Sequence, residues 1–165
     1  MPFLTRLDVA GPYETWPGME QAAAQRFWDA LTLATGDAGH EAGAIYLLGY
    51  VAEMLLKTAY FRVTGVPPSQ NIAPHLTAAR RNASWRGGNL HNLHSWFALL
   101  NDARFFRGNP WGAVVAATIE RRVLIVVSHW RESSRYTSLA ATNAELEEAF
   151  VSVDWLLGNY DALWR

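Results

Sequence analysis

Residues 41–64 read EAGAIYLLGYVAEMLLKTAYFRVT, and this stretch decides the fold class that we predict for the chain. Apolar residues lie on every side of a helix built from it, and between Glu41 and Arg62 the only charged residues are Glu53 and Lys57. A helix that is apolar all round is normally the central one of a bundle, because each face then has a neighbour to bury against. We therefore expect an all-α protein with this helix at its centre.

A polar and aromatic stripe runs along this helix. Steps of four, three, four and three residues place five side chains on one face: Tyr46, Tyr50, Glu53, Lys57 and Tyr60. Glu53 lies four residues before Lys57, the only lysine in the chain, which is the favourable order for an ordinary intrahelical ion pair worth about 0.2–0.5 kcal/mol. The alternative is that the two charges line a cavity, where burial costs free energy unless they meet partners or a ligand.

Length and composition narrow the class of protein. The 165 residues fit one domain, and the absence of cysteine excludes disulfides and thiolate chemistry. The net charge of −1 argues against a protein that coats nucleic acid or membranes without specificity. The first residues have no basic segment followed by an apolar run, so we expect no signal peptide. No uninterrupted apolar run reaches about 18 residues, so we expect no membrane-spanning helix and a cytoplasmic location.

The charge is unevenly distributed along the chain. Residues 54–101 contain no carboxylate and carry a charge of +5, whereas the last 25 residues carry −4. This layout predicts a positive surface that attracts phosphate or RNA, although solvated faces alone can produce the same pattern.

The remaining pattern predicts an up-and-down bundle of four to five helices, four of them long and one shorter. Residues 1–18 are rich in proline and glycine, so we expect an extended arm, held to the body by apolar residues such as Trp16, before a single domain at 19–165. Thr142 with Glu145 three residues later is a capping-box signature that predicts the start of the last helix. Helical patterns cover six segments, from which we expect the four to five helices of the bundle: 19–35, 41–64, a short one near 75–81, one from 91 to a break at 104–112, 111–130, and one from 142 to about 164.

Arg86 and His91, in the segment RGGNLH, are the first pair of residues that can carry chemistry. An arginine that holds a phosphate and a histidine that acts as general acid or base are the groups that metal-free RNA cleavage needs. The alternative is a loop arginine in solvent and a histidine near the start of a helix.

Two further sets of residues surround the stripe. His91 and His94 share a helix face and could recruit Glu53 as a metal ligand, but the paired Glu-x-x-His signature of carboxylate-histidine bundles is absent, so we expect no metal. Arg135 and Tyr136 either belong to a solvated helix end or turn inward towards the stripe, where Arg135 would neutralise Glu53 or hold a ligand phosphate.

Three segments, taken together, resemble the HEPN domains, the higher-eukaryote and prokaryote nucleotide-binding helical bundles. AIYLLGYVAEMLLKTAY at 44–60 fits the pattern A-x-Y-L-x-G-Y-x-x-E-x-x-L-K of the central helix in a bacterial branch of that family. LHNLHSWFALL at 90–100 resembles the family's His-x-Leu start of the third helix, and WRESSRY at 130–136 resembles its late W-x-x-x-x-R-Y segment.

The resemblance implies an often dimeric bundle, often encoded beside a nucleotidyltransferase partner in toxin-antitoxin or defence systems. Many members are metal-independent endoribonucleases that use an Arg-x4-6-His motif at the dimer interface. Here Arg86 and His91 fit that spacing, but they precede the third helix instead of lying in the late one, and Gly87 stands where active members favour a polar residue. These departures favour the branch that binds a nucleotide or a partner without cutting RNA.

The leading hypothesis is a HEPN-like domain, without strong catalysis and without a cofactor, that binds a nucleotide or RNA phosphate and that forms a homodimer. The ribonuclease toxin is the first alternative, and an interaction module whose tryptophans form a dimer or partner face is the second. The residues that we expect to line the ligand pocket are Tyr50, Glu53, Lys57, His94, Arg135 and Tyr136, joined by His91.

Overall fold

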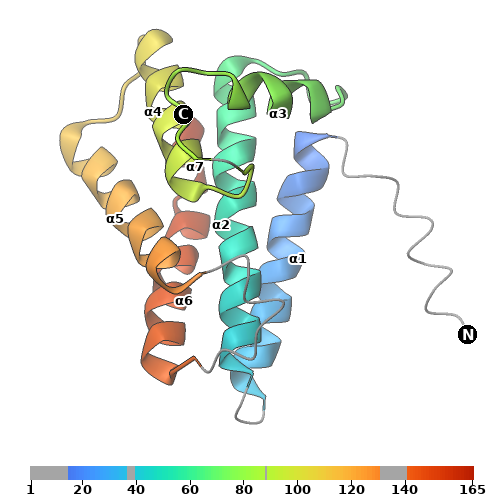
Figure 1. Ribbon diagram of the computed structural model, residues 1–165, viewed down its shortest axis with the longest axis vertical. Coiled ribbons are helices and arrows are strands. Elements are labelled where there is room, and N and C mark those ends of the chain that lie inside the picture. The colour runs from blue at the N-terminus through green and yellow to red at the C-terminus, as the bar shows by residue number, and fades with distance from the viewer. Residues whose placement is uncertain (1–14, 37–39, 88, 131–140) are drawn as a thin grey trace, which may run out of the picture.

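A computed structural model describes residues 15–36, 40–87, 89–130 and 141–165 (Figure 1). These residues form helices and turns without a strand, so the predicted all-α class is confirmed for the part of the chain described. The helices are α1 Trp16–Thr35, α2 Glu41–Thr64, α3 Ala73–Arg80, α4 Leu93–Phe106, α5 Ala113–His129, α6 Asn143–Gly158 and α7 Tyr160–Trp164.

Helix α2 is the centre of the molecule, as its composition predicts. It runs between α1 on one side and α4, α5 and α6 on the other (Figure 1), and 13 of its 24 residues are buried. The helix ends where predicted, at Gly65, whose φ of 80° lies in the left-handed region that glycine adopts without strain. Among the described helices α2 alone is long and apolar enough to cross a membrane, but a buried core helix meets that criterion equally well.

Two of the predicted boundaries are wrong by a few residues. Helix α1 begins at Trp16 instead of residue 19, because Thr15 caps it by accepting a hydrogen bond from the Gly18 N–H at 3.4 Å. Helix α4 continues to Phe106, past the break predicted at Arg104. Arg104 is buried with 4% of its surface exposed, and its guanidinium lies 5.1 Å from the centroid of the Trp111 ring.

The C-terminal region contains one correct prediction and one error. The capping box is present, because the Glu145 N–H donates to Thr142 Oγ1 at 3.2 Å and the Thr142 N–H donates to Glu145 Oε2 at 2.8 Å. The single helix predicted to reach Trp164 is broken at Asn159, which separates α6 from α7. The described chain therefore has five helices of at least 14 residues and two short ones, instead of four long helices and a shorter one.

Trp16 joins the start of α1 to the body of the protein. Its indole Nε1 donates a hydrogen bond to the Val66 carbonyl oxygen at 2.8 Å, just beyond the end of α2. The contact predicted for this tryptophan is present, but Trp16 is a helical residue and not part of an extended arm. Residues 1–14, the rest of the predicted arm, lie outside the described part of the chain.

Candidate functional site: a polar cleft beside the central helix

The Glu53–Lys57 ion pair is buried in the middle of α2. Only 3% of Glu53 and 6% of Lys57 is exposed, and the Lys57 ammonium donates to Glu53 Oε1. The ammonium also lies 5.3 Å from the centroid of the Trp96 ring of α4, within the range of a cation–π interaction. Removing two charges from water costs several kcal/mol per ion, roughly, before their mutual attraction and other contacts offset it. This pair is therefore not an ordinary surface ion pair.

His91 contacts the second carboxylate oxygen of Glu53. Its Nδ1 lies 2.9 Å from Glu53 Oε2, and its ring packs edge-on against Tyr50 with centroids 5.8 Å apart. The residue stands just before α4, whose start is fixed by Asn92 through a hydrogen bond from the Ser95 N–H to Asn92 Oδ1 at 2.9 Å. A carboxylate that accepts from Nδ1 fixes the orientation of the imidazole. His91 therefore lies against the stripe, but it is not among the residues that line the cleft described next, where it was expected.

A cleft of about 510 Å³ opens between α1 and α2 along the stripe. Its size falls in the range of roughly 300–1,000 Å³ that is common for small-molecule sites. It is lined from α1 by Met19, Ala22 and Arg26, and from α2 by Tyr46, Leu47, Tyr50, Glu53, Met54 and Lys57. Four of the five residues of the stripe therefore lie in its wall. The hydroxyls of Tyr46 and Tyr50 are hydrogen-bonded at 3.1 Å, which fixes one edge of that wall.

Arg26 is the cleft residue that the sequence analysis missed. Its Nη1 lies 3.0 Å from Asp29 Oδ2 in a pair whose side chains are 43% and 38% exposed, and Gln25 Nε2 donates to the other Asp29 oxygen at 3.0 Å. Met19, Ala22 and Arg26 follow helical spacing, which was the available signal. This spacing is a weak signal, because the neighbouring face of α1, which includes Phe27, is more apolar.

Gly49 and Trp130 meet on the side of α2 next to Tyr50. A Cβ atom at Gly49 would lie 2.1 Å from two atoms of the Trp130 ring, so only glycine admits the indole there. The same ring packs edge-on against Tyr50 with centroids 5.6 Å apart. Two of the three segments that carry the family resemblance are therefore in direct contact, which gives a packing reason for their residue pattern.

Other residues expected at the site lie elsewhere. Among the described residues, neither Arg86 nor His94 lines the cleft. Arg86 is exposed, while its backbone is held to α4: its N–H donates to Ser95 Oγ at 3.0 Å, and its carbonyl accepts from Asn92 Nδ2 at 2.8 Å. Tyr60, the last residue of the stripe, is not in the cleft wall but packs against Trp96. Arg135 and Tyr136 lie outside the described residues.

Glu53 does approach one of the two histidines considered as metal ligands. However, within the part of the chain that the structure describes, no group of three or more His, Cys, Asp or Glu side chains is placed to hold a metal ion. The contact between Glu53 and His91 is accounted for by a hydrogen bond, and His94 makes no third member of such a group.

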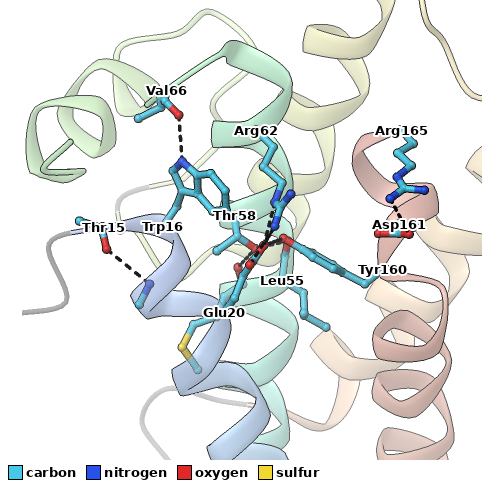
Figure 2. Close-up of polar contacts among 12 residues, drawn as sticks. Thr15, Trp16, Glu20, Leu55, Thr58, Arg62, Val66, Tyr160, Asp161 and Arg165 are labelled. Carbon is cyan, nitrogen blue, oxygen red and sulfur yellow. Dashed lines mark hydrogen bonds and ion pairs between the residues drawn. The ribbon is translucent and has the colours of Figure 1, made fainter. Parts of the chain in front are cut away.

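A second polar cluster, which we name the Arg62 clasp, joins α1, α2 and α7 (Figure 2). Arg62 binds Glu20 through two hydrogen bonds, Nε to Oε1 at 2.8 Å and Nη2 to Oε2 at 2.9 Å. The Tyr160 hydroxyl donates to Glu20 and lies 2.9 Å from Thr58 Oγ1. Burial, followed by the hydrogen bond to Glu20, raises the pKa of Tyr160 well above its ordinary value of 10.0.

Two tryptophans enclose the clasp. The Arg62 guanidinium lies 4.3 Å from the centroid of the Trp16 ring and 4.4 Å from that of Trp164. No local sequence pattern predicts this cluster, because its members come from opposite ends of the chain. None of its residues lines the cleft, and its hydrogen bonds join three helices.

The fold and the site together define an all-α protein with a partly charged cleft between its first two helices. Comparison with known proteins gives no match, either to a protein-family model, to a curated protein or to a solved structure. The function is therefore argued from the geometry of the cleft.

Proposed function

We propose that this protein is a HEPN-like helical bundle that binds a nucleotide, or the phosphate of RNA, in the cleft between α1 and α2 without strong catalysis. The observation that carries the proposal is the Glu53–Lys57 pair, which is buried in the central helix and yet forms part of the cleft wall. Both charges of this pair come from one helix, and their contacts with the α4 region are His91 for Glu53 and the Trp96 ring for Lys57. A ligand that hydrogen-bonds to it gives a reason for burying two charges there.

The rest of the wall supports a ligand with an aromatic ring. Tyr46 and Tyr50 supply ring edges and hydroxyls, and Met19 and Met54 supply polarizable thioethers that adapt to a flat group. Arg26 brings a guanidinium, which is well suited to phosphate. A nucleotide has a flat aromatic ring, polar groups for the hydroxyls and a phosphate for the guanidinium in one molecule.

The test is calorimetric titration with the four ribonucleoside monophosphates and a short RNA. We expect at least one of them to bind, and the double substitution Glu53→Gln with Lys57→Met to abolish binding while the bundle remains folded. The control is Asp161→Asn with Arg165→Met, which removes another acid–base pair four residues apart, here two exposed side chains at the end of the chain, and which should bind like the wild type. Undiminished binding by the cleft variant would show that the ligand site is elsewhere.

A second function, metal-independent RNA cleavage, is favoured by one observation. Glu53 holds the imidazole of His91, as a carboxylate does for a general acid or base, and Arg86 is presented by a loop fixed to α4. This function predicts RNA cleavage in EDTA and growth arrest on expression, both lost in His91→Ala. Intact RNA after incubation with the wild-type protein in EDTA would eliminate it and leave the binding function.

The resemblance also supplies the proposed setting, which is a cytoplasmic homodimer that acts with a nucleotidyltransferase in a toxin-antitoxin or defence system. Light scattering of the purified chain measures the dimer, and co-purification with a nucleotidyltransferase encoded next to it measures the partner. If the protein is instead a plain interaction module, the Glu53 and Lys57 substitutions will change only its melting temperature, and no nucleotide will bind.

A further inference from the structure

We infer that the ligand enters the cleft ring-first, with its aromatic base against the Glu53–Lys57 pair and a single phosphate at the mouth on Arg26. The ligand class is thus a nucleoside monophosphate, and not an RNA strand gripped by Lys57. This inference rests on the proposed function, because it assigns the orientation and class of the ligand at that same site.

The inner part of the cleft is poorly suited to phosphate. Lys57 is the cation there, but its ammonium is already bound to Glu53, and the other oxygen of that carboxylate is bound by His91. A phosphate that reached Lys57 would also meet the carboxylate of Glu53, and repulsion between like charges is strong where water is excluded. The pair offers a donor and an acceptor side by side, which is the complement of a nucleobase edge.

The apolar and aromatic residues that line the cleft suit a flat ring. Leu47, Met19 and Met54 provide apolar surface, and the Tyr46 and Tyr50 rings stand edge-to-face with centroids 5.0 Å apart. Contact of bases with aromatic side chains contributes to binding whichever base is present. The ring of the ligand therefore has more to gain inside the cleft than its phosphate has.

Arg26 provides the phosphate contact at the mouth. Two cations are among the described residues that line the cleft. The carboxylate partner of Lys57, Glu53, is also in the lining, whereas that of Arg26, Asp29, is not. That pair is two-fifths exposed, and exposed pairs of this kind contribute little, so the guanidinium can turn to a ligand at small cost. Asp29 would keep its hydrogen bond from Gln25. One guanidinium matches one phosphate group, to which it can bind with two parallel hydrogen bonds.

The experiment titrates the wild type and Arg26→Gln with a nucleoside, its 5′-monophosphate and its triphosphate. The wild type should bind the monophosphate about tenfold more tightly than the nucleoside, as expected for a charge-assisted contact. Arg26→Gln should bind both equally, with the nucleoside affinity unchanged. Asp29→Asn, which releases Arg26, should raise the affinity for the monophosphate and leave the affinity for the nucleoside unchanged. The matched control is Arg121→Gln, an exposed arginine on α5, which should behave like the wild type.

The outcomes separate this inference from the function on which it rests. If Arg26→Gln retains the preference for the monophosphate, the orientation is wrong while the nucleotide site stands. A triphosphate that binds much more tightly than the monophosphate would also overturn the single-phosphate assignment. If the wild type binds none of the three ligands, the inference fails, and the proposed function fails with it unless the short RNA binds.

Discussion

The cleft and the Arg62 clasp contain the same chemical groups but differ in where those groups come from. Both place a carboxylate, a cation and tyrosine against α2. In the clasp, Glu20, Arg62 and Tyr160 come from three different helices, and two indole rings enclose the guanidinium. At the cleft, the ion pair lies within one helix and forms a wall of open space. The clasp joins three helices directly through its polar groups, whereas the cleft pair lies within α2 and forms part of the wall of a cleft, where a ligand can also contact it.

The largest effect that tests this comparison is expected at the cleft pair. Glu53→Gln alone leaves the buried Lys57 without a carboxylate, and we expect a loss of about 3–5 kcal/mol in the free energy of unfolding. Adding Lys57→Met should restore most of that loss, because a buried pair replaced by groups of similar volume is often neutral. Urea unfolding of the wild type, the single variant and the double variant measures both changes.

A double variant as unstable as the single one would mean that the pair itself stabilises the fold, and the contrast with the clasp would disappear. The exposed pair Asp161–Arg165 is the control for the chemical change. Its double substitution should shift stability by less than about 1 kcal/mol.

Substitution in the clasp is expected to lower stability without changing ligand binding. Arg62→Met leaves Glu20 unpaired between three helices, and because both side chains are about one-quarter exposed, we expect a smaller loss of about 2–3 kcal/mol. Ligand affinity, measured by calorimetry well below the melting temperature, should not change. A variant with normal stability and weakened binding would reverse the roles that we assign to the two regions.

Gly49→Ala tests the packing beside the cleft. The new Cβ would overlap the Trp130 ring, and overpacking of this kind typically costs about 1–3 kcal/mol. Gly43→Ala is the matched control on the same helix, because its Cβ would make only an ordinary contact, 3.5 Å from Leu33 Cδ1, and alanine favours helix. Equal melting temperatures for the two variants would contradict the close approach of Trp130.

The sequence predicts the parts of this structure that depend on local spacing. The bounds of α2, the capping box at Thr142 and the shared face of Glu53 and Lys57 all follow from helical periodicity or from contacts three and four residues apart. Burial of the pair follows less directly, from the apolar character of the whole helix.

Contacts between distant segments were not predictable in the same way. Arg26 lines the cleft only because α1 packs beside α2, and Tyr160 meets Glu20 across 140 residues of sequence. A single sequence gives no register between helices, so neither the cleft nor the clasp has a local signature. The Arg86 and His91 pair shows the converse. Its spacing looked catalytic, but only His91 contacts the stripe.

The smallest expected effect is the pH dependence of stability that Tyr160 gives to the clasp. Tyr160 has a raised pKa, first because it is buried and then because its hydroxyl donates to Glu20, so the folded state holds this proton more tightly than the unfolded chain does. The stabilisation is fully present below about pH 10, the ordinary pKa of tyrosine, and is lost as the pH rises further, by at most about 1.4 kcal/mol per pH unit. Tyr160→Phe should lower stability by about 1 kcal/mol at neutral pH, through the lost hydrogen bond, and should flatten the decline above pH 10. Urea unfolding of both proteins from pH 8 to about pH 11 measures the difference in slope. The burial-raised pKa of Tyr60 leaves part of the decline in the variant, but parallel curves for the two proteins would show that Tyr160 is not held as a neutral phenol in the clasp.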